Sequence, residues 1–132
     1  MTKLWLSALL GLGLALAAGG AEAGPVADEV KMAMGEARQN LVAMVGAADM
    51  AEYPQREMAI QAATAKVDAT VAAHPQALAA FNAVWMEFKN TRDTQIIPAL
   101  KAGKVADAKA LASGIQAERV KKMNEALSAV AD

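Results

Sequence analysis

The sequence predicts an all-α protein, an antiparallel up-down-up-down four-helix bundle preceded by a cleaved signal peptide. Three observations lead to this prediction. Apolar residues recur at steps of three and four along four successive segments, which is the spacing that lines one face of a helix. No stretch alternates with period two, and the helix-favouring residues Ala, Lys, Glu, Gln and Met dominate. The breaks between segments are short, and short connections make neighbouring helices antiparallel.

The N-terminal segment has the organisation of a secretory signal. Lys3 forms a short positive region, residues 4–18 are apolar, and Ala21-Glu22-Ala23 is a small-x-small cleavage site. The apolar run is shorter than the ~20 residues that a membrane-spanning helix needs. We therefore expect a signal peptide at residues 1–23, export to the periplasm, and one four-helix domain at residues 24–132.

Composition argues against several classes of function. The chain has no Cys, which excludes disulfides, thiolate metal sites and thioether-attached haem. Once Lys3 and Glu22 are removed, 12 basic residues face 13 acidic ones, a balance that does not favour nucleic acid as a partner. No paired-His zinc motif or Gly-rich phosphate loop occurs, and nothing in the sequence places His74 beside Ser113 or Ser128. We therefore expect a protein that is not an enzyme.

The first two helices are expected within residues 27–73. Asp28 is the expected N-cap of the first helix, and residues 49–54 separate it from the second, with Pro54 in that helix's first turn. His74-Pro75 ends the second helix, because the residue before a proline avoids the α region. The positions expected to be buried are Val30, Met34, Ala37, Leu41, Met44 and Ala48 in the first helix, and Ile60, Ala63 or Thr64, Val67 and Val71 in the second.

The third and fourth helices are expected to form a hairpin. Pro75 is expected to open the third helix, and Pro98 to kink or loosen its last turn. Gly103 supplies the left-handed residue that ends it. The positions expected to face the core are Leu78, Phe81, Trp85, Phe88, Ile96 and Leu100 in the third helix, and Val105, Ala108, Leu111, Ile115, Met123, Leu127 and Val130 in the fourth.

The hairpin contains, in order, Trp85, Phe88, Arg92-Asp93, an Ile-Pro-Ala-Leu turn and Ala102-Gly103-Lys104, and the first helix contains Arg38-Gln39-Asn40-Leu41. Together these motifs resemble the periplasmic ligand-binding four-helix bundle of methyl-accepting chemotaxis proteins. The resemblance implies a non-catalytic sensing or binding module. Those receptors continue through the membrane into signalling regions, whereas this chain stops at Asp132, so we do not expect a direct transmembrane output. The candidate partners are a second copy of the chain, in a homodimer, and a membrane-bound signalling partner.

A second resemblance concerns the length of the mature chain and the Gly-Lys-Val turn before its last helix. Both are similar to the periplasmic four-helix b-type cytochromes, which hold haem through a Met of the first helix and a His of the last. Against that pattern, Met34 falls at the Met ligand and Met123 at the position of the missing His. Antiparallel helices would bring His74 to the same end of the bundle. The alternative function is therefore a bundle that carries haem b or copper on Met34, Met123 and His74, whereas the leading one needs no cofactor.

Two arginines fall in step with the apolar faces of the last two helices, where a buried guanidinium needs a partner. One interpretation is that Arg92 and Arg119 meet a small acidic ligand such as a carboxylate, because their planar forks match it. With Trp85 they form the predicted ligand-binding set. The alternative is intramolecular pairing, for which the sequence offers Asp93, Glu87 and Glu118.

Overall fold

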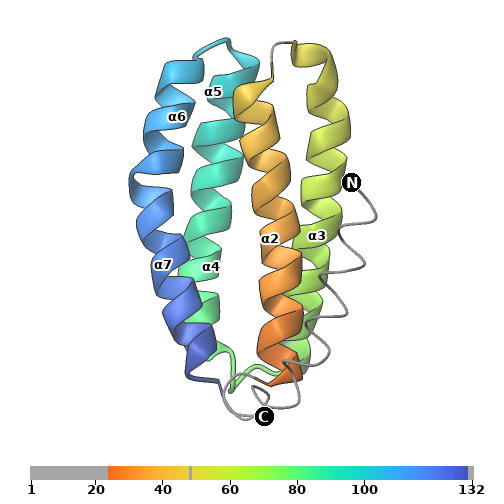
Figure 1. Ribbon diagram of the computed structural model, residues 1–132, viewed down its shortest axis with the longest axis vertical. Coiled ribbons are helices and arrows are strands. Elements are labelled where there is room, and N and C mark those ends of the chain that lie inside the picture. The colour runs from red at the N-terminus through yellow and green to blue at the C-terminus, as the bar shows by residue number, and fades with distance from the viewer. Residues whose placement is uncertain (1–23, 48, 131–132) are drawn as a thin grey trace, which may run out of the picture.

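The computed structural model describes residues 24–47 and 49–130. This part of the chain is all-helical and contains no strand, and four long helical arms lie side by side in it (Figure 1). Every helix within these two ranges is too short or too polar to span a bilayer. The predicted signal peptide at 1–23 and the predicted core position Ala48 lie outside the described residues.

The first hairpin consists of α2 (Pro25–Gly46) and α3 (Tyr53–Ala73), joined through the short 3-10 helix η1 (Met50–Glu52). The prediction that Asp28 caps α2 is wrong, because the helix already begins at Pro25 with Gly24 as its N-cap. Proline fits a first helical turn, since its φ is fixed there and its missing N–H has no partner to lose. Asp28 lies within that first turn, where a carboxylate complements the helix dipole.

Helix α3 has the ends that the sequence predicts. Pro54 lies in its first turn, and His74 is the C-cap residue after Ala73. Side-chain contacts at 3.4 Å join Thr70 to Glu29 and Lys66 to Glu36, so the late part of α3 packs on the early part of α2. The two helices therefore run in opposite directions.

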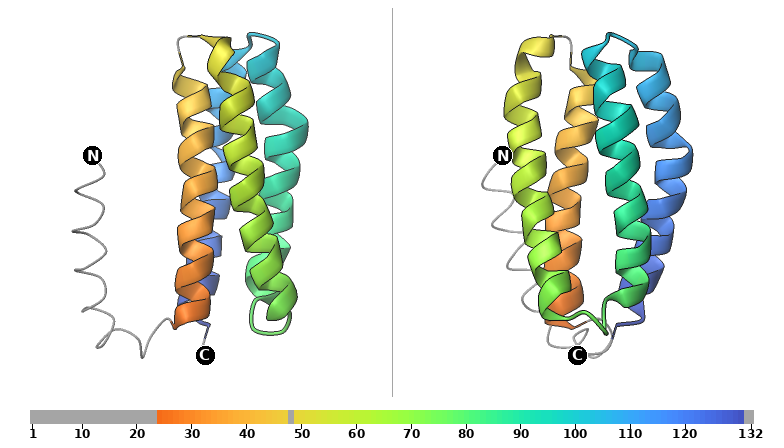
Figure 2. Two further views of the ribbon diagram at one scale, coloured as in Figure 1. Left: turned by 90° about the vertical axis from the view of Figure 1, so that its right-hand side faces the viewer. Right: turned by 180° about the vertical axis from the view of Figure 1, so that it is seen from behind.

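The second hairpin has two arms, and each arm is interrupted. The first arm consists of α4 (Ala79–Thr91), the π-helical segment η2 (Arg92–Ile96) and α5 (Ile97–Lys101). The second arm consists of α6 (Val105–Ser113) and α7 (Ile115–Ser128). The α2–α3 and α5–α6 connections lie at one end of the molecule, and the α3–α4 connection lies at the other (Figures 1 and 2).

The start of α4 differs from the prediction that Pro75 opens this helix. Residues 75–78 form a turn instead, in which the Leu78 N–H donates to the His74 carbonyl oxygen at 3.0 Å. Leu78 is fully buried and is the N-cap residue of α4. The chain therefore reverses direction through a single separate helical turn that delivers Leu78 to the core, and only then begins the helix.

Pro98 perturbs its arm further upstream than the last turn, where the sequence predicts the perturbation. The Ile97 N–H donates to the Arg92 carbonyl oxygen, five residues back, which is the π-helical register. Proline has no N–H with which to continue the ordinary ladder to Thr94. The widened turn therefore lies before Pro98, and Ile97–Lys101 remains helical.

Gly103 ends the arm as predicted, with φ at 80°. The Gly103 N–H donates to the Leu100 carbonyl oxygen at 3.0 Å, and the Lys104 N–H donates to that of Ala99 at 2.8 Å. This pair of bonds is the Schellman motif, which satisfies the last carbonyls of a helix.

The last arm breaks at Gly114, although the sequence predicts a continuous fourth helix. Gly114 has φ −97° and ψ −103°, and a Cβ atom added there would lie 2.8 Å from the Ala110 carbonyl oxygen. The break changes which residues face inward. The prediction that Ile115 faces the core is wrong, since its side chain is 45% exposed, whereas Gln116 is only 2% exposed.

The buried apolar residues form two clusters, one towards each end of the bundle. All six positions predicted to face the core in the third helix are confirmed as buried. The cluster towards the α3–α4 connection, here named the Trp85 cluster, contains Ala27, Val30, Ala33, Met34, Val67, Leu78, Phe81, Trp85, Phe88, Met123, Leu127 and Val130. The other, here named the Leu100 cluster, contains Leu41, Met44, Tyr53, Ile60, Ile96, Ile97, Leu100 and Ala108.

Candidate functional site

Arg92 is a fully buried charged side chain, and it lies between the two clusters along its helical arm. Its Nε and Nη2 atoms donate to the two carboxylate oxygens of Asp93, at 2.9 and 3.3 Å. Its Nη1 atom donates to Thr64 Oγ1 on α3 at 3.0 Å. A carboxylate that accepts from two guanidinium nitrogens is the strong, bidentate form of this ion pair. The structure thus contains the intramolecular pairing that the sequence offers as an alternative to ligand binding.

Arg119 is also held by its own chain. Its Nη1 atom donates to Gln116 Oε1 at 2.9 Å and also reaches Thr91 Oγ1 and the backbone oxygen of Glu87. Its Nε atom lies 3.8 Å from the Glu87 carboxylate, which completes an ion pair with the acidic residue predicted for it. Glu118, the other candidate partner, is exposed.

These side chains form a polar layer in the middle of the bundle, defined here as Thr64, Thr91, Arg92, Gln116 and Arg119. The two arginines share no hydrogen-bond partner within the described residues, although Thr91 and Arg92 are neighbours in the chain. Every buried side-chain nitrogen and oxygen in the described part of the chain has a hydrogen-bond partner. A ligand that bound Arg92 would have to displace these bonds, because all three of its guanidinium nitrogens are engaged. Arg119 is 19% exposed and donates through Nη1 alone, and ligand binding at either arginine stays a prediction.

Trp85, the third member of the predicted ligand-binding set, is fully buried and joins the two hairpins. Its Nε1–H donates to Asp68 Oδ1 on α3 at 2.8 Å, and Lys89 Nζ reaches the same oxygen at 2.8 Å. The indole is stacked between Phe81 and Phe88, with ring centroids 5.9 and 5.7 Å away. A buried indole with its N–H satisfied contributes a large apolar area to the core.

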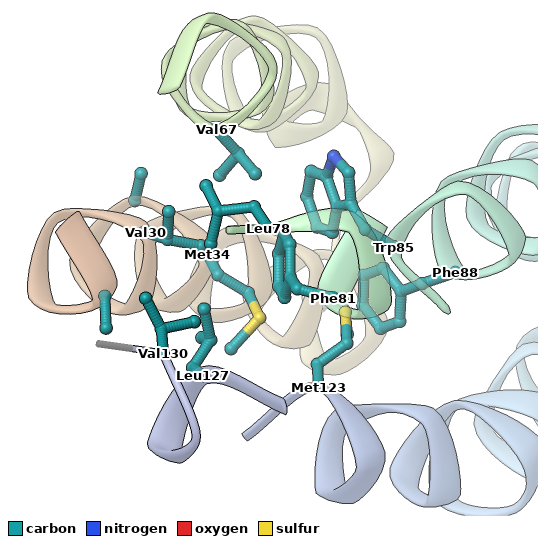
Figure 3. Packing of buried hydrophobic residues seen from close by; sticks show 12 residues of the cluster. Val30, Met34, Val67, Leu78, Phe81, Trp85, Phe88, Met123, Leu127 and Val130 are labelled. Carbon is teal, nitrogen blue, oxygen red and sulfur yellow. The ribbon is translucent and has the colours of Figure 1, made fainter. Parts of the chain in front are cut away.

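The predicted metal ligands are only partly brought together. Met34 and Met123 are both buried in the Trp85 cluster, and Figure 3 shows their side chains approaching it from opposite sides, from α2 and α7. His74 is exposed in the α3–α4 connection and is not part of that cluster. Within residues 24–47 and 49–130, no group of three or more His, Cys, Asp or Glu side chains could hold a metal ion.

A haem between the two thioethers does not fit the packing around them. Phe81 and Leu127 are fully buried in the same cluster and take up the interior around the two sulfur atoms (Figure 3). A flat macrocycle would have to displace such side chains from a core packed to native density. The residues present therefore suit a closed apolar core better than a haem pocket.

A groove between α2 and the α6–α7 arm is a feature that the sequence analysis does not identify. Its volume is about 480 Å³, within the range of roughly 300–1,000 Å³ found for small-molecule sites. We name it the α2–α7 groove and define it by its lining residues Arg38, Leu41, Val42, Val45, Phe88, Lys109, Ala112, Ser113, Gln116, Ala117 and Val120.

The α2–α7 groove carries two cations and no carboxylate. Arg38 and Lys109 are exposed, and no Asp or Glu is among the lining residues. Arg38 is the one arginine in the described part of the chain whose side chain forms neither an ion pair nor a hydrogen bond, and the Lys109 ammonium forms none there either. Unlike Arg92, whose three guanidinium nitrogens all donate within the protein, these two cations can bind an anion without giving up an existing partner.

The backbone break and small side chains account for the groove's position. Gly114 interrupts the arm beside the lining residue Ser113, and Ala112 and Ala117 leave room on either side of the break. Beneath them, Gln116 belongs to the polar layer, where its amide donates to the Phe88 carbonyl oxygen at 3.0 Å. The groove therefore lies beside the polar layer, and one member of each apolar cluster, Leu41 and Phe88, contributes to its lining.

One sequence signal was available for this groove. Arg38 belongs to the Arg38-Gln39-Asn40-Leu41 stretch that contributes to the receptor resemblance, but periodicity alone places Arg38 on the solvent side of its helix. The phase change at Gly114, which directs Gln116 inward, has no signature in the apolar spacing. The apolar spacing therefore identified Arg92 and Arg119 as candidates and missed the exposed Arg38.

The serine hydroxyls donate within their own helices. Ser113 Oγ donates to the Lys109 carbonyl oxygen at 2.8 Å, and Ser128 Oγ donates to that of Asn124 at 3.0 Å. Neither is bonded to the exposed His74, so no nucleophile is paired with this base in the described part of the chain.

Comparisons with protein-family models, with curated proteins and with solved structures found no match.

Proposed function

We propose that this chain is a non-catalytic binding module that senses a small acidic ligand in the α2–α7 groove. The observation that carries the proposal is the charge of the groove, where Arg38 and Lys109 stand without carboxylate partners beside an apolar floor. Guanidinium and ammonium groups bind carboxylates through charge-assisted hydrogen bonds, and the apolar floor excludes water from part of the contact.

We retain the receptor-like function that the sequence motifs predict, but we place the ligand in the α2–α7 groove and not at Arg92 and Arg119. Arg92 and Arg119 have their donors directed at Asp93, Thr64 and Gln116. Arg119 then has a positioning role, because it holds the Gln116 amide that lines the groove. The lack of a nucleophile bonded to a base among the described residues supports binding without catalysis.

The proposed setting is the periplasm. We infer that residues 1–23 are removed after export and that the remainder folds as an up-down-up-down bundle. It would act as a homodimer or on a membrane-bound signalling partner. N-terminal sequencing of the exported protein tests the first step, and recovery of an intact residue 1 contradicts it.

Calorimetric titration of the purified protein against a panel of carboxylates and amino acids tests the function. We expect at least one acid to bind, and Arg38→Ala or Lys109→Ala to weaken it about five- to tenfold, the effect of losing one exposed charge-assisted contact. Lys122→Ala is the matched control, because Lys122 is exposed and outside the groove.

The same titration separates the two candidate sites. If Arg119→Ala or Arg92→Ala weakens the acid while Arg38→Ala and Lys109→Ala bind it normally, the ligand lies against the polar layer, as the sequence predicts. If no acid in the panel binds, the sensing function itself is wrong.

A further inference from the structure

The two cations of the α2–α7 groove are placed at opposite ends of it. Helix α2 and the α6–α7 arm run in opposite directions (Figure 1). Arg38 is the first α2 residue of the lining and Lys109 the first from the other arm. In an antiparallel pair, the beginning of one lining stretch lies level with the end of the other. Arg38 therefore lies at the Val120 end of the groove, and Lys109 lies at the Val45 end.

The span between these ends follows from helix geometry. The lining runs from Arg38 to Val45 along α2, and at a rise of 1.5 Å per residue this stretch is about 10 Å long. Both cationic side chains are long and exposed, so each can swing inward to meet a shorter ligand or outward to meet a longer one.

The floor between the two ends is mainly apolar. Leu41 and Phe88 are buried members of the two clusters, and Val45 and Val120 are partly buried against them. Gln116, the polar lining residue at the floor, has its amide bonded to Phe88 and Arg119, so it is already satisfied within the protein. The middle of the groove thus favours an apolar body over a polar one.

We propose, on the basis of the binding function above, that the groove takes an elongated molecule with an anionic group at each end of an apolar body, of the α,ω-dicarboxylate type. One carboxylate binds Arg38 and the other binds Lys109. The body lies over Leu41, Phe88 and Val120, where it covers apolar surface.

This arrangement distinguishes three classes of acid. A fatty acid of the same length covers the floor but leaves one cation without a partner. A compact diacid carries both charges, but both side chains must swing inward to meet it, and it covers little apolar surface. An elongated diacid uses both ends and the floor, and because its second contact is intramolecular once the first has formed, the two contacts reinforce each other.

Calorimetric titration of the purified protein with suberate, octanoate and succinate tests the proposal. We expect suberate to bind about five- to tenfold more tightly than octanoate and more tightly than succinate. Arg38→Ala and Lys109→Ala should each reduce suberate to the affinity of octanoate. Ala117→Glu, which adds a carboxylate to the exposed groove wall, should weaken suberate more than octanoate, and Lys122→Ala should change neither.

The outcomes separate this inference from the function on which it rests. If octanoate or succinate binds as tightly as suberate, and Arg38→Ala still weakens it, the groove binds acids but the two-ended ligand is wrong. If suberate binds most tightly but Ala117→Glu and both alanine variants leave it unchanged, the ligand lies elsewhere and the inference also fails. If none of these acids binds, and no acid of the wider panel binds either, both the two-ended ligand and the proposed sensing function are wrong.

Discussion

The two hairpins have similar helical lengths but differ in regularity. In the first hairpin, α2 and α3 are uninterrupted helices of 22 and 21 residues. In the second, the π-helical segment Arg92–Ile96 divides one arm and Gly114 divides the other. Both irregularities coincide with buried polar side chains, because Arg92 begins the π segment and Gln116 follows the break.

The difference shows where the bundle departs from a simple apolar core. Regular helices present one continuous stripe to the interior, and the first hairpin contributes mostly apolar residues and threonines to it. The second hairpin changes phase twice, and each change admits a polar group that needs a specific partner. The α2–α7 groove lies between the two kinds of arm. One side is the uninterrupted helix α2, and the other is the α6–α7 arm, which is interrupted at Gly114.

The largest expected effect tests the contact that joins the hairpins. Trp85→Ala should lower the free energy of unfolding by about 3–5 kcal/mol, because it removes a fully buried aromatic side chain and its bond to Asp68. Met86→Ala is the control, since Met86 is next in the chain and 59% exposed, and it should change stability by less than about 0.5 kcal/mol. Urea unfolding measures both. A loss below about 1 kcal/mol for Trp85→Ala would mean that Trp85 does not anchor the core.

Glycine substitutions compare the regular and the broken arms directly. Gly114→Ala should destabilise the protein by about 1–3 kcal/mol, because the new Cβ would lie 2.8 Å from the Ala110 carbonyl oxygen and the backbone must shift. Gly35→Ala on α2 meets nothing within 4 Å and should stabilise the protein by about 0.5–1 kcal/mol. Thermal unfolding of the two variants gives the comparison. If Gly114→Ala is as stable as Gly35→Ala, the break does not depend on glycine.

The regular hairpin was largely predictable from the sequence. Apolar spacing identified the buried positions from Val30 to Met44, and Pro54 and His74 marked the ends of α3. The exception was Asp28, because a capping preference of about 1 kcal/mol does not decide where a helix begins when Pro25 fits the first turn. Local signals suffice where the backbone stays regular.

The second hairpin and the candidate site were less predictable, for a physical reason. Apolar spacing assumes a constant angle per residue, and a π-helical turn or a break resets that angle, so Ile115 was assigned to the core in place of Gln116. Arg92 was detectable, because a charge in step with an apolar face is conspicuous. The groove at Arg38 could not be predicted from the sequence. An exposed arginine indicates a binding site only when the helix that faces it, and the charges on that helix, are known.

The ion pairs of the two hairpins should differ in strength. Asp93→Asn removes the half-exposed carboxylate that pairs with the buried Arg92, and we expect a loss of about 1–2 kcal/mol, since the Arg92 side chain is 1% exposed and keeps only weaker acceptors. Glu36→Gln removes the pair with Lys66, in which both side chains are more than half exposed, and should cost less than about 0.5 kcal/mol. Chemical denaturation of both variants measures the difference. Equal effects would show that the Arg92 pair is no stronger than a surface ion pair.

The smallest expected effect concerns the place where the first and last helices meet in the Trp85 cluster. Met34 and Met123 approach each other there from the two hairpins, so a haem held between them would have to separate the hairpins and displace Phe81 (Figure 3). We expect added haem to produce no sharp Soret band and no change in the free energy of unfolding, because the packed cluster leaves no flat space for the macrocycle. Absorption spectra of the wild type, of Met34→Ala and of Met123→Ala provide the measurement. A sharp band in the wild type that disappears in both variants would establish the cytochrome-like alternative and show that the hairpins can part. Indifference to haem in all three proteins would assign both methionines to the core as apolar side chains.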